Sequence, residues 1–261
     1  MGGELAGQVA LVTGGGRGIG RAVAEAVARA GAAVTVTARS PHELDETAAA
    51  ITAAGGQVLA RPADVRDAAA IQQLAADTAR QFGPVSLLVN NAGTPGPAGN
   101  DWEVDAAAWW ECVEVIVRGA FLCTQAVMPG MIQRGGGRII QMASVTGTRA
   151  YPPMTATSVA KTALIRMTEG LAQSAGPHGV ATFAIHPGVV KTRLLESYGL
   201  TIPDSMYAPP EQAAGLCVRL ATGRYDALSG RFLTITDDLD ALAARADDLS
   251  TQEQLLLRIK A

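Results

Sequence analysis

The stretch TGGGRGIG, at Thr13–Gly20, constrains the fold more than any other part of this chain. It follows the apolar run VALVT, which predicts a β-strand, and it precedes an amphipathic stretch at Ile19–Ala30, which predicts a helix. A glycine cluster between a strand and a helix permits a tight turn. The helix N-terminus behind it presents unpaired N–H groups to a phosphate. The order strand, turn and helix therefore predicts a dinucleotide-binding unit, and a glycine-rich connector without a ligand is the alternative.

The glycines of this turn have different expected uses. Gly14 would permit the tight turn, Gly18 would let the backbone approach a pyrophosphate, and Gly20 would let the helix pack closely on the strand. Ile19 lies between the last two and is included in the predicted cofactor site.

The residues at the end of the second predicted strand indicate which dinucleotide binds. A site for NAD would place an acidic residue there to hold the ribose hydroxyls. This chain has Thr37, Ala38 and Arg39, and no acidic residue follows before Glu43. Because Arg39 and Arg17 can pair with a 2′-phosphate, the sequence favours NADP(H) over NAD(H). The alternative is that both arginines only face water.

Apolar β-type runs alternate with alanine-rich helical stretches along most of the chain. Strands that are apolar at every residue are buried on both faces, and their alternation with helices is typical of a parallel sheet. We therefore expect a single α/β domain over residues 1–261, a Rossmann-type doubly wound parallel sheet with helices on both faces. The expected strands are Val9–Thr13, Val34–Ala38, Val58–Arg61, Val85–Val89, Arg138–Ala143 and Val180–Ile185. The expected helices are Ile19–Ala30, Pro41–Ala54, Asp67–Phe82, one within Asp105–Arg134, and one near Thr157–Ala175.

Charge and cysteine content exclude several function classes. The formal net charge of −3 gives no field that would attract nucleic acid. The three cysteines are scattered, with neither a disulfide framework nor a metal-binding spacing, so we expect no metal site. No apolar run reaches membrane-spanning length, and the start, MGGELAG, has neither a signal-peptide nor a myristoylation pattern. We expect a cytoplasmic protein that does not bind a membrane.

Four further motifs occur in a fixed order, and three of them follow successive predicted strands. They are NNAG at Asn90–Gly93, SVTG at Ser144–Gly147, the lysine of TATSVAK at Lys161, and PGVVKT at Pro187–Thr192. Together with the glycine-rich turn, their spacing and order resemble the short-chain dehydrogenase/reductase family, in its subgroup with TGxxxGxG. The resemblance covers about residues 5–235 and implies a Rossmann-type fold that binds NAD(P)(H).

The resemblance also implies roles for individual residues. Asp64 and Val65 would flank the adenine, and Asn90 would lie near the cofactor. Lys161 would hold the nicotinamide ribose hydroxyls, and Thr192 the carboxamide. The matching motifs add Ala92, Gly93, Pro187 and Gly188 to the expected cofactor site.

The catalytic set of the family is incomplete in this chain. The family uses Asn, Ser, Tyr and Lys, and here Ser144 and Lys161 match by spacing, whereas Thr157 stands at the tyrosine position and Ile116 at the asparagine position. An aliphatic hydroxyl does not ionise in the range of a phenol, and its oxygen lies roughly 4 Å nearer the backbone. Loss of the general acid would cost ~10²–10⁴-fold in rate.

Two replacements for the missing phenol remain open. A water could bridge Thr157 and the substrate oxygen while Ser144 donates to that oxygen, or Tyr151, six residues upstream, could move the proton. An aromatic wall of the pocket is the simpler interpretation of Tyr151. His186 could titrate near neutrality, but it is given no role.

The loops after the strands offer an apolar and aromatic lining, typical of a pocket for a hydrophobic ligand. Its candidate residues are Pro95, Trp102, Tyr151, Met154, Leu194, Leu195, Tyr198, Met206 and Tyr207. The sequence thus favours an NADP(H)-dependent oxidoreductase with a degenerate active site, acting on a hydrophobic or aromatic carbonyl or alcohol. Two alternatives stay open: a non-redox enzyme such as a cyclase, isomerase or dehydratase, and a catalytically silent NADP(H)-binding protein.

The resemblance implies a homodimer or homotetramer packed through two long helices. The acidic helical tail at 237–261 departs from the common ending of the family. It could cover the cofactor groove or a partner subunit, and it argues against the tetramer.

Overall fold

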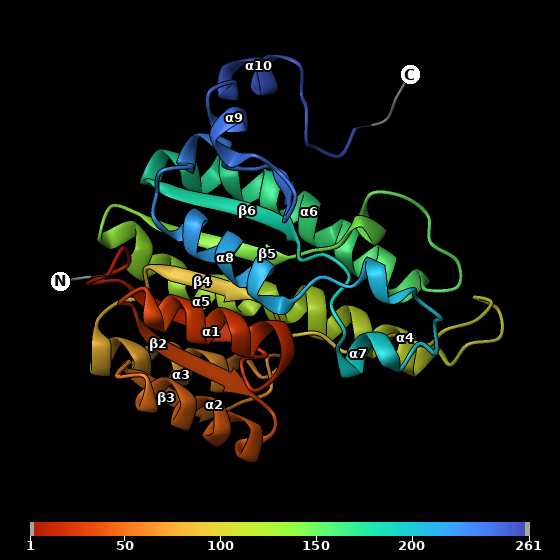
Figure 1. The fold of residues 1–261 in the computed structure, drawn as a ribbon, viewed down its shortest axis with the longest axis horizontal. Helices are drawn as coiled ribbons and strands as arrows, with labels where there is room; N and C mark the ends of the chain where they lie inside the picture. Colours follow the sequence, from red (N-terminus) through yellow and green to blue (C-terminus); the bar gives the residue numbers. More distant parts are fainter. Residues whose placement is uncertain (1–2, 259–261) are drawn as a thin grey trace.

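A computed structural model describes residues 3–258 and shows one sheet with helices on both faces (Figure 1). The sheet has seven strands in the order β3-β2-β1-β4-β5-β6-β7, and every neighbouring pair is parallel. The strands are β1 (Val9–Thr13), β2 (Ala33–Ala38), β3 (Val58–Pro62), β4 (Leu87–Asn90), β5 (Gly137–Met142), β6 (Val180–His186) and β7 (Phe232–Thr234). The doubly wound parallel sheet expected from the sequence is confirmed.

The helices form two layers. In Figure 1, α1 and α8 lie in front of the sheet, where they pack on each other, and α5 lies behind it. The helices are α1 (Gly18–Arg29), α2 (Pro41–Ala53), α3 (Ala68–Phe82), α4 (Ala106–Val113), α5 (Gly119–Gln133), α6 (Thr155–Ala175), α7 (Arg193–Glu196), α8 (Pro210–Ala221), α9 (Leu239–Ala243) and α10 (Ala246–Thr251). The sequence did not predict α7, α8 or β7.

The central strands are apolar because both of their faces are covered. Every residue of β1 and of β4 is buried. On one face Val12, Val23 and Phe183 belong to one buried cluster, and on the other Leu11 and Ile139 belong to a second. Burial on both faces removes the polar alternation that a half-exposed strand would show.

The long helix predicted within Asp105–Arg134 is present but not uniform. A π-helical turn at Glu114–Arg118 joins α4 to α5, and such turns are frequent at functional sites. The stretch Ala106–Gln133 is long and apolar enough to span a membrane, yet half of its most apolar window is buried. Val127 and Met131 belong to the core cluster beneath the sheet, as in a core helix of a soluble fold.

The described part of the carboxyl-terminal tail packs against the sheet and the helices α1 and α8. Leu239 and Leu249 are buried in the core cluster of α1 and α8. The outward N–H groups of β7 are both bonded within the chain: Phe232 donates to the Leu255 carbonyl and Thr234 to the Asp237 carboxylate. Residues 259–261 of the predicted tail lie outside the described residues.

Candidate active site

The carboxyl ends of β1 and β4 define the crevice of the sheet. From β1 the chain proceeds outward to β2 and β3, and then returns to β4 on the other side of β1. The loops after β1 and β4 therefore separate to opposite faces. This is the place where open parallel sheets bind ligands.

The glycine-rich turn lies at this crevice and has the shape of a phosphate cradle. Gly14 and Gly18 have φ values of +64° and +54°, in the left-handed region that favours glycine. A Cβ atom on Gly20 would stand 2.1 Å from the Gly14 carbonyl oxygen, so only glycine permits this packing. Helix α1 begins at Gly18, and Arg17 before it makes no side-chain capping bond. The first N–H groups of α1 are therefore available for an anion, and the turn fits a dinucleotide pyrophosphate.

The NNAG motif after β4 is hydrogen-bonded to the glycine-rich turn. The Asn91 side chain donates to the carbonyls of Thr13 and Gly14, at 2.9 and 3.2 Å. The Asn90 side chain, in contrast, donates to Ala120 O and Thr124 Oγ1 of α5. The buried Asn90 Nδ2 thus points into the helix layer, whereas its Oδ1 has no hydrogen-bond partner among the described residues. The expected place of Asn90 near a cofactor stays a prediction.

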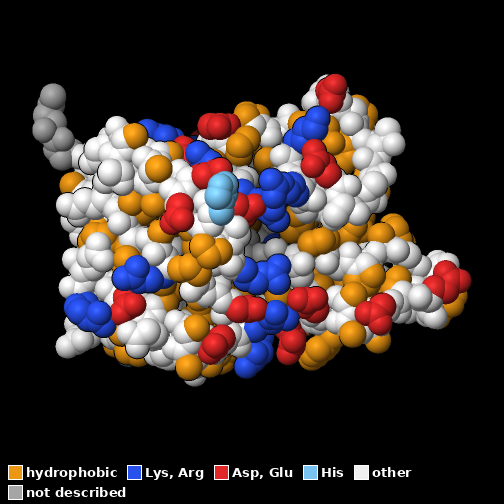
Figure 2. Space-filling model, turned by 90° about the horizontal axis from the view of Figure 1, so that it is seen from below, with side chains coloured by type: hydrophobic (Ala, Val, Ile, Leu, Met, Phe, Trp, Pro, Cys, Tyr) orange, Lys and Arg blue, Asp and Glu red, His pale blue; other side chains and the backbone are white. Residues whose placement is uncertain are grey.

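Charged residues surround the end of the groove that would hold the adenosine. Figure 2 views the molecule from the side of β3 and α2 and shows basic and acidic side chains intermingled around a hollow. Asp64 forms a bidentate pair with Arg66, whose hydrogen bonds lower the pKa of that carboxyl. Arg39 is 63% exposed and lies 4.0 Å from Glu111. Among the described residues, this long contact is the one ion pair of its guanidinium.

The loop after β6 crosses the groove opposite the glycine-rich turn. Gly188 has a φ of +80° and packs against Ile235. The Thr192 hydroxyl caps α7 by accepting from Leu195 N, and its methyl group lies 3.4 Å from the position of a Cβ on Gly18. Thr192 therefore lies directly opposite Gly18 of the glycine-rich turn.

Two exposed ion pairs connect that loop and the glycine-rich turn to α2. Arg193 of α7 and Arg17 of the turn both contact Glu43 Oε1 of α2, at 3.0 and 3.1 Å. Exposed ion pairs contribute only ~0–1 kcal/mol, so these two contacts break at little cost in free energy. The Arg17 guanidinium is thus already paired with a carboxylate at this edge of the groove.

Lys161 lies on α6, one turn after Thr157. The residue keeps some exposed surface, but its ammonium is enclosed by protein and donates to the Met142 carbonyl oxygen at 2.5 Å. This desolvation lowers its pKa from 10.5 to about 8, and the nearby Cys112 thiol opposes the change. Lys161 is thus a positively charged side chain at neutral pH, close to the point where β5 ends.

Ser144 follows β5 and is oriented by its own backbone. Its Oγ accepts from Thr146 N at 3.2 Å. Since this bond uses only a lone pair, the hydroxyl proton remains free to donate to a substrate oxygen.

Thr157 is buried and belongs to a chain of hydrogen bonds that the sequence did not predict. Its Oγ1 lies 2.5 Å from the hydroxyl of Tyr198 and 3.7 Å from Cys112 Sγ. Tyr198 accepts in turn from Gly96 N at 3.0 Å, and Cys112 donates to Thr94 O. The sequence indicated Tyr198 only as part of the pocket lining. No local spacing links residues 157 and 198, because their contact depends on how the loop after β6 folds back.

The other predicted positions have simpler environments. Ile116 is 2% exposed and packs with Cys112 and Leu164 on α4 and α6, as expected of a packing residue. Tyr151 is 39% exposed, and its hydroxyl bonds to no other described residue. Burial lowers the pKa of His186, which makes a positive charge there unfavourable near neutral pH.

Comparison with known proteins agrees with this geometry. Residues 8–202 match a family described as short chain dehydrogenase. The chain is 33% identical to the short chain dehydrogenase mpl6 of Monascus purpureus, over 97% of this chain and 89% of that protein. It is 36% identical to a 3-oxoacyl-[acyl-carrier-protein] reductase of Synechocystis sp., over 84% of this chain and 90% of that protein. Its fold superposes with a TM-score of 0.82 on 7α-hydroxysteroid dehydrogenase complexed with NADH and 7-oxo glycochenodeoxycholic acid, at 28% identity over 88% of this chain and 93% of that one.

Proposed function

The chain belongs to the short chain dehydrogenase family, and on that premise we propose that it is an NADP(H)-dependent oxidoreductase acting on a hydrophobic or aromatic carbonyl or alcohol. The cradle at the glycine-rich turn carries the cofactor part of this proposal. Two left-handed glycines, the uncapped start of α1 and the crevice between β1 and β4 coincide there. A relative with a similar fold was solved with NADH, which supports the same cofactor class here.

The residues of this chain can stabilise an oxyanion without the phenol that the family uses. A bound nicotinamide supplies or accepts the hydride. Ser144 would donate a hydrogen bond to the substrate oxygen, and the Lys161 ammonium would stabilise negative charge that develops there. The buried Thr157 would act through its hydrogen-bond partner, the Tyr198 hydroxyl.

A coenzyme assay tests this function. We expect the wild-type protein to oxidise NADPH in the presence of medium-sized hydrophobic ketones or aldehydes. Loss of the Ser144 donor in Ser144→Ala should reduce kcat by about 10²–10³-fold. Binding of NADPH, measured by calorimetry, should stay unchanged in that variant. Failure of both binding and turnover across such carbonyls would reject the proposal.

One observation favours a second candidate, a non-redox enzyme on the same scaffold. The residue at position 157 has a hydroxyl that does not titrate, so the acid–base step common to the family is altered. Conversion of a substrate without any change in nicotinamide absorbance would identify this case. Tight NADPH binding with no product of any kind would identify a silent coenzyme-binding protein.

The choice between NADP and NAD rests on Arg39 and Arg17. Within residues 3–258, the one ion pair of Arg39 is its contact with Glu111 at 4.0 Å, and the end of β2 offers no carboxylate to ribose hydroxyls. We predict that Arg39→Ala weakens NADPH binding about tenfold, the effect of losing one charge-assisted bond, and leaves NADH binding nearly unchanged. Arg29→Ala, which removes an exposed arginine at the far end of α1, is the control. Equal losses for both coenzymes in Arg39→Ala would contradict a 2′-phosphate contact.

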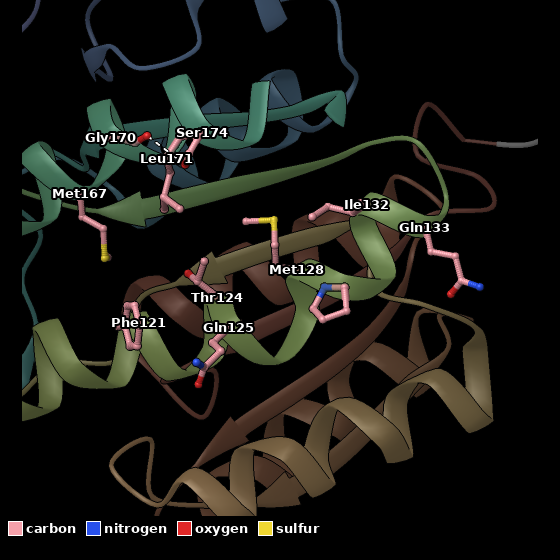
Figure 3. A pocket seen from close by; sticks show the side chains of 11 residues that line it. Phe121, Thr124, Gln125, Met128, Ile132, Gln133, Met167, Gly170, Leu171 and Ser174 are labelled. Carbon is pink, nitrogen blue, oxygen red and sulfur yellow. Dashed lines mark hydrogen bonds between the residues drawn. The ribbon is translucent and has the colours of Figure 1, made fainter. Parts of the chain in front are cut away.

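The face formed by α5 and α6 is the proposed contact between copies of the chain. A cavity of about 840 Å³ opens between these helices, with an almost wholly apolar lining. Figure 3 shows Phe121 and Met128 of α5 and Met167 and Leu171 of α6 around it. Phe121 is 52% exposed, and exposed apolar surface of this kind marks association sites.

We predict that Phe121→Glu shifts the protein from a homodimer to a monomer, or from a homotetramer to a dimer, in sedimentation experiments. Burying an unpaired carboxylate in that contact is strongly unfavourable. Trp102→Glu is the control, because Trp102 is 82% exposed on a loop outside both helices. A wild-type protein that sediments as a monomer would contradict the proposal.

A further inference from the structure

We propose that Tyr198 supplies the phenol that the active site lacks at position 157, and that Thr157 positions it. This inference rests on the oxidoreductase function proposed above. It assigns the proton step to a residue of the loop after β6 instead of a residue of α6.

The position of Tyr198 supports this assignment. The family resemblance implies a phenol at position 157 of α6, where this chain has the shorter threonine. The Tyr198 hydroxyl lies 2.5 Å from Thr157 Oγ1, and the residue is 9% exposed. Tyr198, from the opposite side of the groove, thus reaches Thr157, whose own side chain is too short to place a hydroxyl where a phenol would lie.

The hydrogen bonds around the phenol suit proton transfer. Gly96 N–H donates to the Tyr198 oxygen at 3.0 Å, so it would hold a phenolate after the proton leaves. Burial raises the pKa of Tyr198, and hence the phenol keeps its proton near neutral pH. The titratable groups that face this cluster are Cys112 on α4, beside Thr157, and Lys161, which faces Cys112.

The segment that carries this phenol also contacts the proposed cofactor groove. Tyr198 lies two residues after α7, whose Arg193 binds Glu43 and whose Leu194 lies beside Gly93. The loop after β6 therefore places the phenol at Thr157 while it packs against the loops that follow β1 and β4.

The chemical step balances with the residues present. In carbonyl reduction the substrate carbon gains a hydride from the reduced nicotinamide, and the carbonyl π-bond electrons pass to oxygen. That oxygen takes the proton of the Tyr198 O–H, whose bonding pair stays on the phenolate. Water then returns a proton to Tyr198. Thr157 keeps its own proton throughout and fixes the phenol by one hydrogen bond.

Tyr198→Phe tests the proposal, because it removes one oxygen and keeps the ring. We expect kcat to fall about 10²–10⁴-fold while NADPH binding stays within about twofold of wild type. Thr157→Val should give a smaller loss of kcat, since the phenol remains but is no longer oriented. Tyr225→Phe is the matched control: its phenol bonds Arg219 and Asp240 away from the site, and we expect turnover to be unchanged.

A double variant distinguishes a chemical role from a structural one. Thr157→Tyr combined with Tyr198→Phe returns a phenol to α6, and it should recover a large part of the turnover lost in Tyr198→Phe. Full turnover in Tyr198→Phe would overturn this proposal alone. A wild-type protein that binds NADPH but reduces no carbonyl would overturn the proposed function and this assignment together.

Discussion

Replacement of Lys161 by methionine is expected to stabilise the protein by about 1–2 kcal/mol at pH 7 and to lower turnover by about 10²-fold or more. The reason is the enclosed ammonium. Its pKa falls from 10.5 to about 8 because burial disfavours the charged form. This pKa difference corresponds to a free-energy cost of about 3 kcal/mol for a fully buried charge. The expected cost is about 1–2 kcal/mol because the Lys161 side chain keeps some exposed surface.

The stabilisation should depend on pH in a defined direction. The folded pKa lies below the unfolded one, so between about pH 8 and 10.5 the unfolded chain binds more protons than the folded one. The free energy of unfolding of the wild type therefore rises with pH through this window. Below about pH 8 the buried ammonium destabilises the fold by its full amount. The advantage of Lys161→Met should accordingly be largest at pH 7 and vanish near pH 10.5.

Urea unfolding at the two pH values measures this effect. Lys191→Met is the matched control, since Lys191 is exposed and its change should alter stability little. Equal effects of Lys161→Met at pH 7 and pH 10.5 would show that the ammonium is not desolvated. A variant that is more stable but less active would indicate that Lys161 is kept for its charge rather than for folding.

The second large effect is expected at Gly20. A Cβ there would stand 2.1 Å from the Gly14 carbonyl oxygen and 2.4 Å from Asn91 Nδ2. These atoms belong to the turn itself and to the side chain that fastens it to the loop after β4, so the turn must distort. We predict that Gly20→Ala destabilises the protein by about 3 kcal/mol and abolishes NADPH binding.

The same substitution at Gly215 should change the free energy of unfolding in the opposite direction. It lies in α8, and a Cβ there would meet no atom within 4 Å. Alanine is the better helix former, so Gly215→Ala should stabilise the protein by about 0.5–1 kcal/mol and leave coenzyme binding unchanged. Thermal unfolding and calorimetry of both variants provide the comparison. Similar changes in the two would refute a steric requirement at Gly20.

The sequence predicted the features that depend on neighbouring residues. The apolar runs of β1, β2 and β6 and the glycine-rich turn are encoded within a few residues, and their expected places are close to those observed. The short strand β7 was missed because its three residues carry little periodic signal. Its pairing with β6 comes from the tertiary fold instead.

Side-chain direction and long-range contacts could not be predicted in the same way. Asn90 follows β4 as its motif implied, but its amide points to Ala120 because α5 offers bonding partners there. Tyr198 meets Thr157 across forty-one positions of sequence, through a loop without regular periodicity. Substrate pockets are built mainly from such loops, so their chemistry emerges only from the folded chain.

The bonds that Leu255 and Asp237 make to β7 have a consequence for how this protein behaves at high concentration. An uncovered terminal strand is a template on which another chain can add its own strand, and ordered aggregation begins in this way. Here the two outward N–H groups of the edge strand β7, those of Phe232 and Thr234, already donate hydrogen bonds within the molecule. Proteolytic trimming before Leu255 would free one of them, and we expect the trimmed protein to aggregate more readily than the full chain.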